Sequence, residues 1–156
     1  MAAVTIMLRL GLAALVAAAA AGSLLTLSIF LGSLVAAPPP GWTTVELLAW
    51  LRFGIEAGLI VATLPAFVAG ALMEALGMRA PAARRAAAWA AAGAVIGAAL
   101  WALFEAALWR SHREPAMFGQ DLALLAACLA AGAGAALAFR WVMRRTQWLE
   151  RRRGAV

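Results

Sequence analysis

The chain has 156 residues, of which 66% are hydrophobic and 13% are charged, and its mean hydropathy is +0.92. Soluble domains are about 45–50% apolar and about 25% charged, so this composition excludes an ordinary soluble domain and indicates a membrane protein. The formal net charge of +6 would suggest nucleic-acid binding in a soluble protein. Here the basic residues lie beside long apolar runs, where membrane topology explains them better, and we expect no nucleic-acid partner.

Four apolar segments follow one another along the chain, and each reaches the roughly 20 residues that a helix needs to cross a bilayer. They cover about residues 10–36, 50–76, 86–109 and 121–142. The links between them are short and rich in Pro, Gly and charge, so consecutive helices are expected to be antiparallel neighbours. The sequence therefore predicts an all-α, integral membrane four-helix bundle. Its four-span transmembrane domain covers residues 1–142, and a basic cytoplasmic tail covers residues 143–156.

The N-terminal segment resembles a secretory signal peptide, because it has one basic residue followed by apolar residues and Ala-x-Ala sequences. Its apolar run, however, continues to residue 37. A hydrophobic length of roughly 25 residues exceeds the 7–15 residues of a signal-peptide core. We therefore expect this segment to be retained as the first span.

The arginines predict an orientation. Ten of the 13 arginines fall on the side of the membrane that holds the two ends of the chain, and three fall on the other side. By the positive-inside rule, both termini are expected in the cytoplasm. The Ala-rich and Lys-free composition is typical of a GC-rich bacterial genome. The predicted location is the bacterial inner membrane.

The second span carries the charged residues that most resemble a functional site. Arg52 and Glu56 are four residues apart on a helix and can pair, and Glu105 of the third span is expected at a similar depth. These three residues form the candidate polar cluster, which we expect in the outer half of the bundle. The central third of each span lacks an ionisable residue, whereas an ion pathway normally has one near the midplane.

Small residues lie on the opposite face of the second span, at Gly54, Gly58 and Pro65. The same G-x-x-x-G spacing recurs at Gly93 and Gly97 in the third span. Such faces allow two helices to approach closely, either inside the bundle or against a partner chain, and the Ala-rich composition favours packing inside the bundle. Pro65 is expected to kink its helix.

Catalytic and metal-binding groups are sparse. The single histidine, His112, has neither cysteines nor clustered carboxylates beside it in sequence, and the single cysteine, Cys128, lies in an apolar run. No nucleophile with a matching base and no phosphate-binding glycine loop is visible. We therefore expect a protein that is not an enzyme and that has no metal or cofactor.

The tail has aromatic and aliphatic residues on one side of a helix and arginines around the rest. Its basic residues are Arg144, Arg145, Arg151, Arg152 and Arg153. Such a segment can lie as a helix on anionic lipids at the inner leaflet, where each arginine contributes about 1 kcal/mol. Docking to an acidic partner protein is the alternative.

These features favour an accessory or assembly subunit that acts through helix–helix contacts, either with another membrane protein or within a homo-oligomer. The alternative is a transporter of small solutes or ions, or the small membrane subunit of one, that uses the candidate polar cluster. In length and topology the chain is similar to the small membrane subunits of tripartite periplasmic transporters, and GWTTVEL resembles their segment before the second helix. This resemblance covers only a few residues. A membrane enzyme that acts on lipid is a third possibility.

Overall fold

The computed structural model describes residues 2–36, 44–111 and 118–153, and nearly all of these residues are helical. The helices are α1 (Ala2–Ala36), α2 (Thr44–Arg79), the short 3-10 helix η1 (Pro81–Arg84), α3 (Ala86–Ser111) and α4 (Phe118–Arg153). Four of the helices are long and apolar enough to cross a membrane. The predicted all-helical, multi-pass architecture is confirmed at this level.

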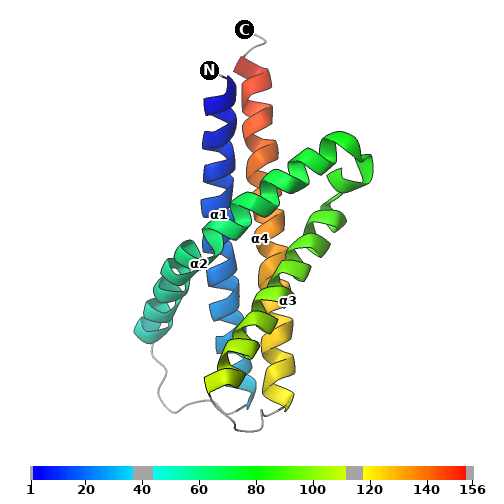
Figure 1. The fold of residues 1–156 in the computed structure, drawn as a ribbon. Helices are drawn as coiled ribbons and strands as arrows, with labels where there is room; N and C mark the ends of the chain where they lie inside the picture. Colours follow the sequence, from blue (N-terminus) through cyan, green and yellow to red (C-terminus); the bar gives the residue numbers. More distant parts are fainter. Residues whose placement is uncertain (1, 37–43, 112–117, 154–156) are drawn as a thin grey trace.

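The two terminal helices form the centre of the bundle. α1 packs against both α2 and α4, and α3 packs against α4, whereas α2 and α3 have almost no direct contact in the described part of the chain. α1 begins and α4 ends at the same end of the molecule (Figure 1). α2 and α3 meet near η1 at that end and diverge toward the other end (Figure 1). We call the end where α1 begins and α4 ends the arginine-rich end, and we call the opposite end the far end.

The contact between α1 and α2 depends on three glycines. Gly22 of α1 lies against the backbone of Gly54 and Gly58, and a Cβ atom on any of the three would collide with backbone or with the side chain of Thr26. Thr26 itself is held in place because its hydroxyl donates to the Gly22 carbonyl at 2.9 Å. Since lipid tails are as apolar as leucine, close van der Waals contact between helices stabilises a membrane bundle where the hydrophobic effect cannot.

The contact between α3 and α4 repeats this arrangement. Gly132 of α4 lies against the backbone of Gly93 and Gly97, and a Cβ atom on Gly97 would meet the carbonyl of Cys128. In each pair, a single glycine of a central helix meets the G-x-x-x-G of a flanking helix. Both motifs that the sequence singles out are therefore used inside the bundle.

The two central helices meet through alanines. Ala13, Ala14 and Ala17 of α1 have at most 1% of their surface exposed and share one buried cluster with side chains of α4. At the arginine-rich end this contact continues into a cluster of larger buried side chains from α1, α3 and α4. The cluster contains Leu10, Trp89, Phe139, Val142 and Met143.

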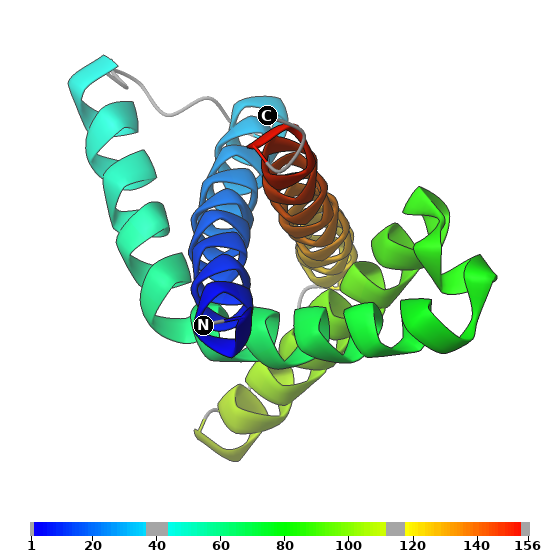
Figure 2. The same ribbon diagram turned by 90° about the horizontal axis from the view of Figure 1, so that it is seen from above.

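α2 bends near its middle, where Pro65 lies within the helix. Seen from above, the two halves of α2 point in clearly different directions (Figure 2). Proline removes one backbone hydrogen bond and its ring clashes with the preceding turn, which explains the predicted kink. The Thr63 hydroxyl donates a hydrogen bond to the carbonyl of Leu59, one turn earlier, and contacts of this kind often bend a helix.

α4 runs without a break to Arg153, whereas the sequence predicts a span that ends at residue 142 and a separate tail. Val142 and Met143 are only 6% and 5% exposed and belong to the same buried cluster as Leu10 of α1. Residues 142 and 143, where the sequence predicts that the span ends and the tail begins, are therefore buried inside the bundle. The first part of the tail is therefore a straight continuation of α4 along α1.

A glycine substitution tests the close approach of α1 and α2. We expect Gly22→Ala to lower the stability by about 1–3 kcal/mol, because the added methyl group collides with the Gly54 backbone, which cannot rotate away. Gly11→Ala on the same helix is the matched control, since a Cβ atom there meets nothing within 4 Å. The thermal unfolding midpoint in one detergent measures both, and equal midpoints for the two variants would contradict the packing.

Candidate functional site

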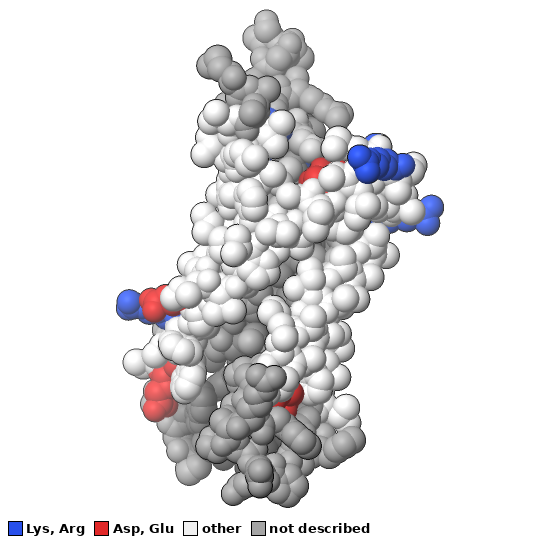
Figure 3. All heavy atoms as spheres, viewed as in Figure 1, with Lys and Arg blue, Asp and Glu red and all other residues white. Residues whose placement is uncertain are grey.

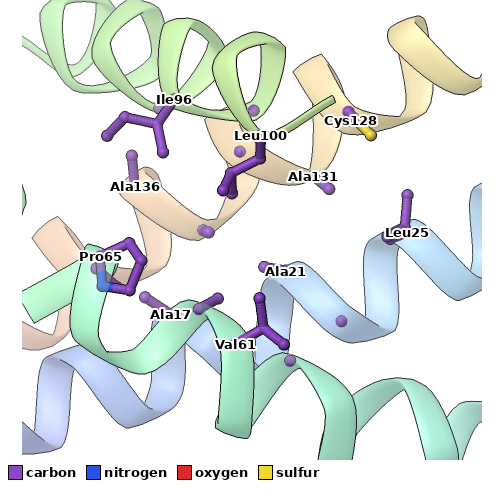
Figure 4. A pocket seen from close by; sticks show the side chains of 18 of the residues that line it. Ala17, Ala21, Leu25, Val61, Pro65, Ile96, Leu100, Cys128, Ala131 and Ala136 are labelled. Atoms are coloured by element: carbon purple, nitrogen blue, oxygen red, sulfur yellow. The ribbon is translucent and has the colours of Figure 1, made fainter. Parts of the chain in front are cut away.

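A groove of about 730 Å³ lies at the centre of the molecule and is bounded by all four long helices. Side chains from α1 and α2 face those from α3 and α4 across it (Figure 4). We call it the central groove. Its labelled lining residues are Ala17, Ala21, Leu25, Val61, Pro65, Ile96, Leu100, Cys128, Ala131 and Ala136. The volume falls within the range of about 300–1,000 Å³ that is typical of ligand pockets.

The lining of the central groove is almost wholly apolar. Its described residues include no Asp, Glu, His, Lys or Arg. The indole N–H of Trp101 is buried and lacks a hydrogen-bond partner among the described residues. The hydroxyl of Thr26 is already used within α1. The groove can therefore hold hydrocarbon, and the thiol of Cys128 is the one titratable side chain among its described lining residues.

An aromatic layer lies at the groove's end nearest the arginine-rich end. Trp89 of α3 and Phe139 of α4 stack with their ring centroids 5.7 Å apart and an interplanar angle of 21°. Gly70 of α2 lies directly against the Phe139 ring, where a Cβ atom would collide with it. This layer joins three helices, and Phe139 is 2% exposed.

Charged residues gather beyond this aromatic layer. Arg140 and Arg144 of α4 both donate to the carbonyl oxygen of Arg84, at 3.0 and 3.3 Å. The guanidinium of Arg84 turns back and donates to the Gly77 carbonyl near the end of α2, at 2.6 Å. Glu74 is half-buried nearby, and Arg144, Arg140 and Arg84 are the charges that act on it. We call Glu74, Arg84, Arg140 and Arg144 the inner charge cluster.

The candidate polar cluster is only partly assembled. Arg52 and Glu56 form an ion pair, with Arg52 Nε 2.8 Å from Glu56 Oε1, and their side chains are 82% and 55% exposed. Glu105 lies on α3, and no ion pair joins it to either residue in the described part of the chain. The structure therefore brings two of the three residues together. The third is on a helix that hardly contacts α2.

The ion pair is exposed in the single chain, although charged residues in a span normally face protein or a wet cavity. The reason lies on the other side of the helix. Gly54 and Gly58 are fixed against α1, so Arg52 and Glu56 point away from the bundle. The surface view shows basic side chains at the upper right and a separate group of charged side chains at the lower left, with uncharged surface between them (Figure 3).

The remaining predicted residues take no part in the two charged clusters, and one of them, Cys128, lines the central groove. In the tail, Arg145 lies over the Trp148 ring at 4.9 Å from its centroid, and the side chains of Arg151, Arg152 and Arg153 are outside the described residues, as is His112. Cys128 is free and half-buried. No group of three or more His, Cys, Asp or Glu residues that could hold a metal occurs within the described ranges.

Two features of the site were not predicted from the sequence. One is the aromatic layer, and the other is the convergence of Arg140 and Arg144 on the carbonyl of Arg84. The sequence analysis uses the arginines only to predict the orientation of the chain, and for that purpose only the side of the membrane on which each arginine lies matters. Their distance of 56 and 60 residues from Arg84 gives no local pattern to detect.

No protein-family model matches the chain, and no curated protein or solved structure is similar to it at a significant level. The resemblance to small membrane subunits of tripartite transporters therefore stays a prediction.

Substitution of the two converging arginines tests the link between α4 and η1. In Arg140→Gln/Arg144→Gln, we expect the backbone amides of Ala80 and of residues 82–86 to exchange about two- to tenfold faster, as the loss of a hydrogen bond worth about 0.5–1.5 kcal/mol implies. Arg145→Gln is the control, because it removes the same charge from the same helix without a contact to η1. Hydrogen–deuterium exchange measures the rates, and an equal acceleration in the control would refute a specific contact.

Proposed function

We propose that the chain is a non-enzymatic accessory or assembly subunit of a membrane complex, and that α2 is the helix it presents to its partner. The observation that carries this proposal is the Arg52–Glu56 ion pair, which is exposed within a helix long and apolar enough to span a membrane. Charged side chains in spanning segments normally face protein or a wet cavity. In the single chain this pair faces neither.

The exposed residues form a ridge that a partner helix can cover. Ile60 and Leu64 continue the line of Arg52 and Glu56 at successive four-residue steps, and they are 83% and 71% exposed. A neighbouring helix packed on this ridge would shield the ion pair from lipid and add the van der Waals contact that stabilises membrane helices. The partner is either another membrane protein or a second copy of this chain.

The apolar lining of the central groove favours an accessory role over the alternative of a solute or ion transporter. A translocation pathway needs coordinating or titratable groups along it, and the described lining residues supply no charged group. The groove is suited to hydrocarbon, which lipid tails can provide. A role as the small membrane subunit of a larger transporter is compatible with the proposal, because such a subunit also acts through helix contacts.

We further propose that both ends of the chain are cytoplasmic in a bacterial inner membrane and that the basic tail lies near anionic lipids of the inner leaflet. Six described arginines support this orientation, because they lie around η1 and along the last part of α4. They are Arg79, Arg84, Arg85, Arg140, Arg144 and Arg145. Arginines near an anionic leaflet are attracted to it over about a Debye length.

Site-specific photo-crosslinking tests the partner face. A photoreactive residue at position 60 or 64 is expected to give a discrete crosslinked product in native membranes, and Arg52→Leu/Glu56→Leu is expected to reduce its yield severalfold, because the partner is proposed to recognise the charged pair. Position 95 is the control. Val95 is 68% exposed, but it lies on α3, away from the proposed face.

The products of crosslinking decide between the classes of partner. A product with the mass of two chains identifies a homo-oligomer, and a product with another protein identifies a heteromeric complex. Crosslinking to lipid alone at positions 60 and 64, or equal protein products at position 95, would argue against a partner face on α2.

Reporter fusions test the proposed orientation. An alkaline phosphatase fused after residue 156 is expected to be inactive, because that enzyme needs the periplasm, and one inserted within residues 110–119 is expected to be active. A green fluorescent protein at the same two positions should give the reverse pattern. The same compartment for both positions would exclude four spans, and exchanged compartments would exclude cytoplasmic termini.

A further inference from the structure

The inner charge cluster holds two guanidinium groups side by side. Arg140 and Arg144 lie one helical turn apart on α4, and one Nη atom of each is within 3.3 Å of the Arg84 carbonyl oxygen. A guanidinium has five N–H donors, so this shared acceptor uses only a small part of their capacity. The Nε–H of Arg140 is buried and has no acceptor among the described residues.

The positive charge of this cluster is not balanced locally. The guanidinium of Arg84 donates to a neutral carbonyl, that of Gly77. Glu74 is the carboxylate whose charge acts on these arginines, but no ion pair within 4.0 Å joins it to them in the described part of the chain. The two guanidinium groups carry the same charge and meet at one carbonyl oxygen, so they repel each other. An anion between the two guanidinium groups would relieve this repulsion.

The position of the cluster indicates which anion can reach it. Arg84 lies between the end of the α2 span at Arg79 and the start of the α3 span at Ala86. The cluster is therefore at the level where apolar spans end and lipid headgroups begin. Arg84 and Arg144 are exposed, so the site is open to the headgroup layer.

We propose that Arg140 and Arg144, which converge at the Arg84 carbonyl, form a binding site for a phosphate group, with the headgroup of an anionic phospholipid as its source. Arginine suits this ligand because its planar fork of donors can make paired hydrogen bonds to phosphate oxygens. The site includes Arg144, the first arginine of the basic tail, and in this it rests on the proposed position of the tail near anionic lipids; the other site arginine, Arg140, lies in the span of α4. It is independent of the proposed partner face on α2.

Lipid binding to the full-length protein tests the site. Protein purified in a mild detergent is titrated with phosphatidylglycerol or with phosphatidylcholine of the same acyl chains, and native mass spectrometry measures the bound fraction. We expect wild type to prefer phosphatidylglycerol, and Arg140→Gln/Arg144→Gln to lose about fivefold in that preference for each arginine. Arg140→Lys/Arg144→Lys, which keeps the charge but not the fork of donors, should retain only part of it.

Two controls separate the site from diffuse attraction. Arg79→Gln/Arg85→Gln removes the same charge from the same end of the molecule without touching the two converging guanidinium groups, and it should leave most of the preference. Arg151→Gln/Arg152→Gln/Arg153→Gln removes the last three arginines of the tail and should also leave the first lipid bound. Inorganic phosphate is titrated separately by calorimetry to test a soluble source.

Each result bears on the proposal. Loss of preference in Arg140→Gln/Arg144→Gln alone supports a lipid headgroup site, and tight binding of inorganic phosphate without a phosphatidylglycerol preference would identify a soluble phosphate as the ligand instead. An equal loss in Arg79→Gln/Arg85→Gln, or no loss in any arginine variant, overturns the site. If the double variant does not fold, Arg144→Gln alone is used, because Arg144 is exposed and its hydrogen bond is the longer of the two.

Discussion

The close approach of helix backbones at glycine is the constraint on which the rest of this bundle depends. Gly22 meets Gly54 and Gly58, and Gly132 meets Gly93 and Gly97, with backbone in contact in both pairs. In water, burial of large apolar side chains could hold such helices together, but in lipid that driving force is absent and contact area has to come from short distances. The buried alanines of α1 extend the same principle to the contact between the two central helices. Among the described residues, the buried core therefore contains few large side chains.

This way of packing also determines what is left open. α2 and α3 each use their glycine face on a central helix and have almost no contact with each other in the described part of the chain, and they diverge from η1 toward the far end. The central groove is the space that this divergence leaves between them. The outward exposure of Arg52 and Glu56 has the same origin, because they lie on the side of α2 opposite to Gly54 and Gly58. The packing of the glycine faces against α1 and α4 therefore determines where the central groove lies and on which side of α2 the ion pair is exposed.

Much of the fold could be predicted from the sequence, because apolar runs of spanning length and the kink at Pro65 are local signals. The sequence could not predict which glycines of different helices lie against one another. Gly22 has no G-x-x-x-G spacing of its own and is recognisable only once α1 and α2 are side by side. In the candidate polar cluster, the four-residue spacing relates Arg52 to Glu56, as the structure has them, whereas depth alone says nothing of the direction in which α3 carries Glu105. The continuous α4 was missed because the arginines after residue 139 suggested a boundary, whereas burial of Val142 and Met143 against α1 extends the helix past it.

The two charged regions differ in a way that bears on function. At the arginine-rich end, Arg140 and Arg144 bind the backbone before α3 and so take part in holding the chain's own helices in place. Arg52 and Glu56 interact with each other on one helix, and in the described residues they hold no second element in place. An ion pair within one helix turn on an exposed surface adds little to stability, and its position in a spanning segment is unfavourable in lipid. Because the Arg52–Glu56 pair contributes little to the stability of the single chain and is unfavourable in lipid, a contact with another chain explains it best. For this reason we assign the partner face to α2 and not to the arginine-rich end, whose arginines already contact other elements of the chain.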